Sequence, residues 1–136
     1  MSKILYTEGY KYQLAEDYIV YVNIKPEKNI YMDFILLSEN GLLIIKKGYA
    51  WDGPSGPAID TKNFMRGSLI HDACYQMMRE GYLNYEKYRK NADLVLKQVC
   101  IEDGMNKIRA WWVYNAVRRW AKDAAKPKKR EILTAP

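Results

Sequence analysis

The spacing of the apolar residues changes near Gly48, and this change constrains the fold more than any other feature of the chain. Before it, Tyr18, Val20, Val22 and Ile24 alternate with residues of the opposite face, which is the two-residue period of a strand with one buried side. After it, apolar residues recur at the spacing of a helix face. Strands followed by helices predict an α+β fold.

The strand region is predicted to form an antiparallel meander. The apolar runs 30–37 and 42–45 follow the alternating segment, and residues 38–41 between them read Ser-Glu-Asn-Gly. Asn40 and Gly41 tolerate the positive φ of a tight connection, so they favour a hairpin here.

A segment rich in glycine and proline, residues 48–57, ends the strand pattern. It predicts a rigid loop between the sheet and the first helix. Because its prolines restrict the backbone and Trp51 adds apolar surface, we expect residues 51–57 to pack over the first turns of that helix.

Three helices are predicted after this loop. Start signals and terminal glycines set their limits, and the short connection at 81–84 makes the first two an antiparallel pair. The predicted spans are residues 61–80, residues 84 or 85 to 102, and residues 106–122.

The chain has 136 residues, which fits one domain with one core. We expect this domain to cover residues 1–123. Residues 124–136 are predicted to form a mobile basic tail, because Lys126, Lys128, Lys129 and Arg130 lie in it.

The composition limits where the chain acts and what it binds. No segment has the roughly 20 apolar residues of a membrane span, and no signal peptide is recognisable at the N-terminus, so a cytoplasmic protein is expected. Cys74 and Cys100 lack C-x-x-C spacing and are expected to be free buried thiols. The 22 Lys and Arg against 16 Asp and Glu give a net charge of +6, which favours anionic partners.

The residues most able to carry chemistry lie on the first two helices. His71 is the only histidine of the chain; it shares a helix face with Tyr75, and Asp72 points about 100° away. Asp93 lies in the middle of the second helix among apolar residues, where an unpaired charge is costly. His71 and Asp93 are equally far from the turn, so we predict that they are hydrogen-bonded.

Two interpretations of this group follow from spacing alone. An Asp that accepts the proton of one imidazole nitrogen leaves the other nitrogen free as a base, which is half of a hydrolytic site. Alternatively, His71, Tyr75 and Asp93 form a buried hydrogen-bond network that only ties two helices together.

The string His71-Asp72-Ala73-Cys74-Tyr75 resembles the H-D-x-C-Y helix of secreted phospholipases A2. The later Ala92-Asp93 is similar to the A-D of the phospholipase segment of parvovirus capsid proteins. A wider resemblance, over residues 48–120, is to a family of unknown function common in tailed-phage genomes. That family has a D-G-x-S-x-P loop, an H-D-x-x-Y helix, an A-D helix and an aromatic, Arg-rich last helix.

The phospholipase resemblance implies a role for each residue. It makes His71 the general base for an attacking water, Asp93 the residue that orients it, and Tyr75 a donor to Asp93. It makes Asp72 a calcium ligand together with loop carbonyls near Gly53 and Gly56, because calcium takes many oxygen ligands. The disulfide lattice of the secreted enzymes is absent here.

The third helix combines tryptophans with arginines and lysines. The ordinary interpretation is a core helix with a solvated basic face. Such a helix can also bind a phospholipid surface or another anionic partner, and nucleic acid is a less favoured alternative. Trp112 and Trp120 discriminate between these interpretations by whether they face outward.

The leading hypothesis is a phage-encoded calcium-dependent phospholipase A2-like ester hydrolase. The first alternative is a non-enzymatic phage accessory protein, a virion component or an antagonist of host defence, with a structural His/Tyr/Asp network. A nucleic-acid-binding module is the further alternative. The phage resemblance implies a location in the cytoplasm of an infected bacterium or in the virion.

Overall fold

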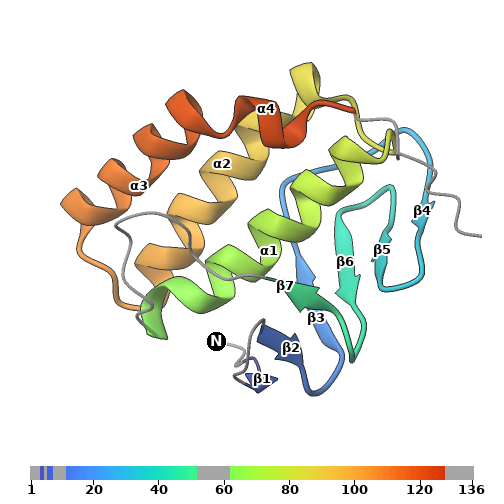
Figure 1. The fold of residues 1–136 in the computed structure, drawn as a ribbon, viewed down its shortest axis with the longest axis horizontal. Coiled ribbons are helices and arrows are strands. Elements are labelled where there is room, and N and C mark those ends of the chain that lie inside the picture. The colour runs from blue at the N-terminus through green and yellow to red at the C-terminus, as the bar shows by residue number, and fades with distance from the viewer. Residues whose placement is uncertain (1–3, 5, 8–11, 52–61, 128–136) are drawn as a thin grey trace, which may run out of the picture.

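The computed structural model describes residues 4, 6–7, 12–51 and 62–127 of the chain. Antiparallel strands occupy the first part and helices the second (Figure 1), so the α+β prediction is confirmed. The strands are β1 (Tyr6–Thr7), β2 (Tyr12–Leu14), β3 (Tyr18–Tyr21), β4 (Ile30–Tyr31), β5 (Ile35–Leu37), β6 (Leu42–Ile45) and β7 (Ala50–Trp51). The helices are α1 (Lys62–Arg79), α2 (Tyr85–Glu102), α3 (Lys107–Trp120) and α4 (Lys122–Ala125).

The strands form two sheets and only part of them is a meander. One sheet has the order β3-β6-β5-β4 and the other the order β1-β2-β7, with antiparallel pairs throughout. The predicted run 30–37 is two strands, because Met32 N donates to Ile35 O (2.8 Å) and closes a turn. That turn contains Asp33, a turn-favouring residue whose signal was overlooked when residues 30–37 were interpreted as one apolar run.

The predicted hairpin at residues 38–41 connects β5 to β6. Gly41 has φ 90°, and a Cβ there would lie 2.4 Å from the carbonyl oxygen of Val22. The close approach exists because Val22 N donates to Gly41 O at 2.9 Å. Glycine is therefore required twice here, by conformation and by space.

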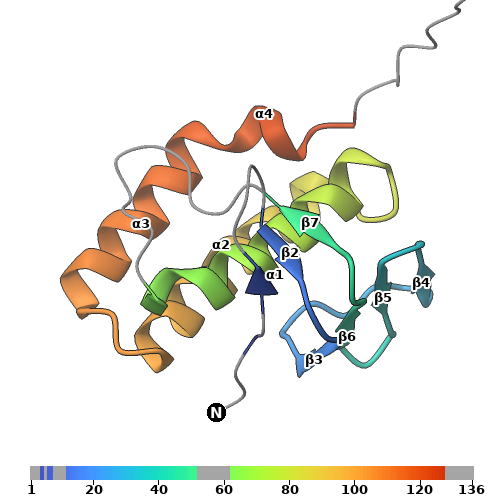
Figure 2. The ribbon, with the colours of Figure 1, turned by 60° about the horizontal axis from the view of Figure 1, so that its bottom comes forward.

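The helices form one layer beside the sheets (Figures 1 and 2). α1 packs against α2, and α2 packs against α3. α1 also contributes Leu69, Ile70, Met77 and Met78 to a core shared with the strands, and all four are almost fully buried. Among the described helices, none is long and apolar enough to cross a membrane.

The last predicted helix and the predicted tail need a correction. The helix ends at Trp120, and a short fourth helix, α4, follows after Ala121. Ala125 is fully buried, and Arg79 Nη1 donates to Ala124 O at 3.1 Å. Residues 124–125 thus belong to the folded domain, because a small apolar side chain packs against α1; residues 128–136 lie outside the described part.

A buried arginine ties the beginning of α1 to the end of α2. Arg66 donates to both carboxylate oxygens of Asp103, at 3.0–3.2 Å, and to Glu102 Oε2 at 3.0 Å. It also donates to the hydroxyl of Tyr18 on β3 at 2.9 Å. Burial alone would lower the pKa of Arg66, but these bonds outweigh it and raise the pKa above its usual value.

The crossing of α1 and α2 depends on Gly67. A Cβ at this position would lie 2.9 Å from Cys100 Sγ and 3.0 Å from Leu96 Cδ1, and both neighbours are buried. We predict that Gly67→Ala lowers the free energy of unfolding by about 1–3 kcal/mol, measured by urea denaturation, because the overpacking exceeds the gain of about 1 kcal/mol in helix propensity.

A double-mutant cycle provides the control for this prediction. In a Cys100→Ala background the nearest neighbour is removed, so Gly67→Ala should destabilise less than in the wild type. An equal loss in both backgrounds would show that the Sγ contact is not responsible.

Candidate functional site

α1 and α2 bring the predicted residues together. His71 Nε2 lies 2.7 Å from Asp93 Oδ1, and the hydroxyl of Tyr75 donates to the same oxygen at 2.6 Å. The rings of His71 and Tyr75, one turn apart on α1, have centroids 4.1 Å apart. The predicted hydrogen bond is confirmed, since the antiparallel pair places both side chains at the same distance from the turn at Gly81.

Two arginines that the sequence analysis did not select complete the surroundings of Asp93. Arg118 Nη1, from α3, donates to Asp93 Oδ2 at 2.9 Å. Arg89 lies one turn before Asp93 on α2, with Nε 4.0 Å from Oδ2, and donates from Nε to the Tyr75 hydroxyl at 3.1 Å. The i,i+4 spacing of Arg89 and Asp93 was a usable signal; the approach of Arg118 was not visible in the sequence.

Arg89 also connects the site to the end of α3. Its Nη2 donates to the carbonyl oxygens of Val117 and Arg118, both at 2.6 Å. These are among the last carbonyls of α3, and at Val117 O the arginine adds to the bond from Ala121 N at 3.0 Å. The Asp93 group therefore links three helices.

Asp93 is held as an anion. Burial alone would raise its pKa, but the hydrogen bonds from His71, Tyr75 and Arg118 outweigh burial and keep the pKa below its ordinary value. The hydrogen bond between Tyr75 and Asp93 has the opposite effect on Tyr75. The pKa of Tyr75 is raised, mainly by burial and then by the contact with Asp93. Tyr75 is therefore a permanent hydrogen-bond donor.

The hydrogen bond to Asp93 defines the two nitrogens of His71. Asp93 is a carboxylate and can only accept, so Nε2 carries the proton of the neutral ring. Within the described part of the chain, no hydrogen bond is made to Nδ1, and the side chain is 13% exposed. Nδ1 is thus the nitrogen at which the neutral ring can accept a proton.

Asp72 lies on a different face of α1 from His71, as predicted. The hydroxyl of Tyr49 shares its one proton between Gln76 Oε1 at 3.1 Å and Asp72 Oδ2 at 3.4 Å. Burial and the Asp72 charge raise the pKa of Tyr49. Gly53 and Gly56, the other expected calcium ligands, lie outside the described residues, and within those residues no group of three or more His, Cys, Asp or Glu could hold a metal.

The start of the glycine-proline segment packs on α1. Trp51 is 2% exposed, and its Nε1 donates to Ser68 Oγ at 3.2 Å. The prediction that residues 51–57 cover the first turns of this helix is confirmed for Trp51. The remainder of that segment lies outside the described residues.

The two cysteines are free and buried, as predicted. Burial raises the pKa of each thiol to about 12. A thiolate is the reactive form of cysteine, so Cys74 and Cys100 are packing residues rather than nucleophiles.

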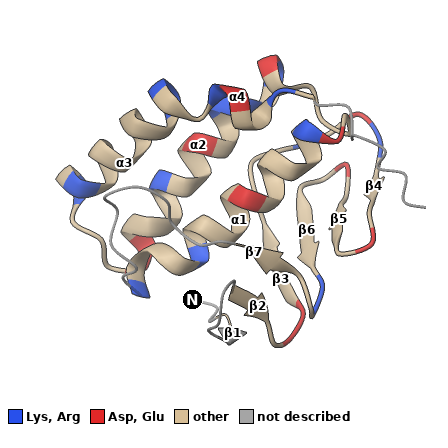
Figure 3. Ribbon diagram, in the orientation of Figure 1, with Lys and Arg blue, Asp and Glu red and all other residues tan. Residues whose placement is uncertain are grey.

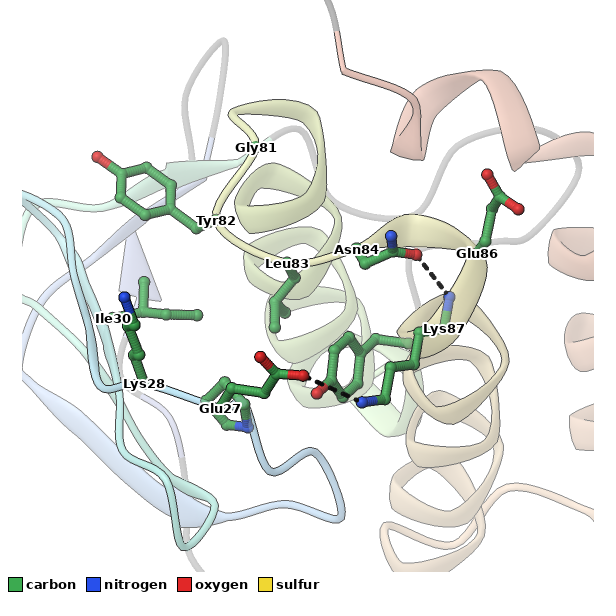
Figure 4. A pocket seen from close by; sticks show the side chains of 11 residues that line it. Glu27, Lys28, Ile30, Gly81, Tyr82, Leu83, Asn84, Glu86 and Lys87 are labelled. Carbon is green, nitrogen blue, oxygen red and sulfur yellow. Dashed lines mark hydrogen bonds and ion pairs between the residues drawn. The ribbon is translucent and has the colours of Figure 1, made fainter.

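A cavity of about 810 Å³ lies beyond the far end of α1, between the α1–α2 turn and residues 26–30. In Figure 4, Leu83 and Ile30 lie on opposite sides of it, and the Glu27–Lys87 ion pair (3.7 Å) crosses one side. His71, Asp72 and Asp93 do not line this cavity. It is therefore separate from the histidine site.

The third helix is not the core helix that its apolar stripe favoured. Ala110 is its one buried residue, and Trp112 and Trp120 are 64% and 76% exposed. α3 lies at the outer edge of the helical layer, and among the described helices and strands its main contacts are with α2 and α4 (Figure 1). Its exposed tryptophans stand among basic residues, which leaves the surface-binding interpretations open.

Comparisons with protein-family models, with curated proteins and with solved structures found no match to this chain.

The low pKa of Asp93 leads to a prediction about acid stability. A carboxylate whose pKa is lower in the folded than in the unfolded state stabilises the fold at pH values above its ordinary pKa of 3.8. This contribution is lost as the pH falls below that pKa. We predict that Asp93→Asn lowers the free energy of unfolding at pH 7 by about 3–5 kcal/mol, because His71, Arg89 and Arg118 lose their shared acceptor charge.

Urea denaturation between pH 7 and pH 3 measures this effect. The variant should lose less stability than the wild type between pH 4 and pH 3, while Asp33→Asn, at an exposed carboxylate, should keep the wild-type profile. Parallel pH profiles for Asp93→Asn and the wild type would contradict the assignment.

Proposed function

We propose that the protein is a histidine-dependent ester hydrolase of the phospholipase A2 type, encoded by a phage. The observation that carries this proposal is that the two ring nitrogens of His71 have different surroundings. Nε2 is hydrogen-bonded to the buried Asp93, and Nδ1 has no hydrogen bond within the described part of the chain. A ring oriented in this way has one nitrogen available as a base.

In the proposed reaction, His71 Nδ1 takes a proton from a water molecule as the water oxygen attacks the ester carbonyl. The imidazolium that forms lies beside Asp93, which favours it by charge and holds the ring in one orientation. The proton then passes from Nδ1 to the leaving alcohol. Tyr75 fixes Asp93 through its hydrogen bond to Oδ1 and does not titrate in this cycle.

Asp72 is the residue that fits a calcium ion in this proposal. Its carboxylate and the Gln76 amide oxygen share the single proton of the Tyr49 hydroxyl, so oxygen atoms, the ligands that calcium prefers, gather on this side of α1. When bound, calcium would polarise the ester carbonyl. Carbonyls near Gly53 and Gly56 would supply further ligands.

One observation favours a second function. Arg118 and Arg89 already lie against Asp93, and this arrangement neutralises the charge that would assist His71. It suits a network whose role is to hold three helices together in a non-enzymatic phage accessory protein. The two functions differ in whether His71 is needed for activity or only for stability.

The test is the release of fatty acid from phospholipid vesicles with and without calcium. We predict that His71→Ala lowers the rate by roughly 100- to 10,000-fold, because a general base contributes about that much. Asp72→Asn should remove the calcium dependence, and Asp33→Asn, at an exposed carboxylate, should retain the wild-type rate.

Thermal unfolding of each variant separates loss of activity from loss of fold. A folded wild-type protein with no release above the Asp72→Asn background would contradict the hydrolase proposal. That result would favour the structural network instead.

A further inference from the structure

A second cavity lies on the other side of the two arginines that contact Asp93. It has a volume of about 240 Å³ and lies between the first turns of α2, the end of α3 and the start of α4. Lining residues are Tyr85, Glu86, Arg89, Lys90, Arg118 and Lys122. Four of these six side chains are cationic and one is a carboxylate, so the cavity is strongly basic.

Part of each guanidinium remains available toward a ligand. Arg89 uses Nε and Nη2 in its bonds to Tyr75 and to the end of α3, and Arg118 uses Nη1 for Asp93. No hydrogen bond within the described residues involves Arg89 Nη1 or Arg118 Nη2. Lys90 and Lys122 are exposed and likewise form no ion pair there.

The two arginines are fixed before any ligand arrives. The Arg89 side chain is 8% exposed and is held by its bonds to Tyr75, Val117 and Arg118. Asp93 holds Arg118, whose side chain is 33% exposed. Little side-chain entropy is therefore lost when an anion binds between them, which favours affinity.

We propose that this basic cavity is a binding site for a phosphate group. Guanidinium groups donate in a planar fork that matches phosphate oxygens, and lysines add charge without fixed geometry. The first turn of α2, which begins at Tyr85, adds the positive end of an 18-residue helix. The volume is below the roughly 300 Å³ of drug-sized pockets, so it suits a small anion or a headgroup.

The phosphate can be free or carried by a lipid, and the surroundings distinguish these sources. Arg119 and Trp120, at the same end of α3, are exposed, and Trp120 is 76% exposed. Figure 3 shows Lys and Arg along α3, which has no Asp or Glu. An interfacial tryptophan beside basic residues is typical of a surface that contacts lipid, so Trp120 reports on a lipid-borne phosphate and not on a free one.

The experiment measures binding of inorganic phosphate by calorimetry at low ionic strength. It also measures sedimentation with phosphatidylcholine vesicles that contain phosphatidic acid. The test variant is Lys90→Gln/Lys122→Gln, which leaves the Asp93 group intact. The matched control is Lys25→Gln/Lys47→Gln, which removes the same charge at two exposed lysines outside the cavity and away from α3.

We predict that the wild type binds at least one of the two phosphate forms and that the test variant binds it about tenfold or more weakly. The control should stay within about twofold of the wild type. Loss of vesicle binding alone in Trp120→Ala identifies the lipid-borne form. Failure of the wild type to bind either form, or an equal loss in the control, would overturn the proposal; neither outcome depends on hydrolase activity.

Discussion

The buried charge of Asp93 is the constraint on which the rest of the helical layer depends. A carboxylate that is 0% exposed loses its hydration, and the effective cost is several kcal/mol unless donors replace the water. The replacement donors come from α1 (His71 and Tyr75) and α3 (Arg118), while Asp93 itself is on α2. The three helices are therefore positioned by one anion as well as by their apolar contacts.

The same group explains how α3 stays in place with little buried surface. Apart from Ala110, its side chains are partly buried or exposed, yet Arg89 binds its last carbonyls and Arg118 reaches inward to Asp93. These polar bonds compensate for the small apolar contact. A consequence is that the outer sides of both arginines form the wall of a basic cavity instead of being covered by a core.

The network around His71 favours a catalytic base by orienting the ring and disfavours it by neutralising the charge of Asp93. The network fixes the ring by hydrogen bonds, which benefits both a catalytic base and a structural tie. Arg118 binds Asp93 Oδ2 and neutralises part of the carboxylate charge. Less of that charge therefore remains to stabilise an imidazolium of His71 at Oδ1. The proposed hydrolase and the structural network are thus two outcomes of one arrangement, and they differ in the balance between Asp93 and its two arginines.

Local rules in the sequence determined the order of elements, the hairpin at Gly41, the ends of α1 and α2, and the His71–Asp93 pair. Each follows from periodicity, from turn chemistry or from equal distances to a turn. The split of run 30–37 and the fourth helix were missed, because Asp33 is the one turn-favouring residue within an otherwise apolar run and burial of Ala125 positions the short fourth helix. Only the tertiary structure brought Arg118 to Asp93 and left Trp120 exposed, since a helix stripe has the same period whether it faces a core or solvent.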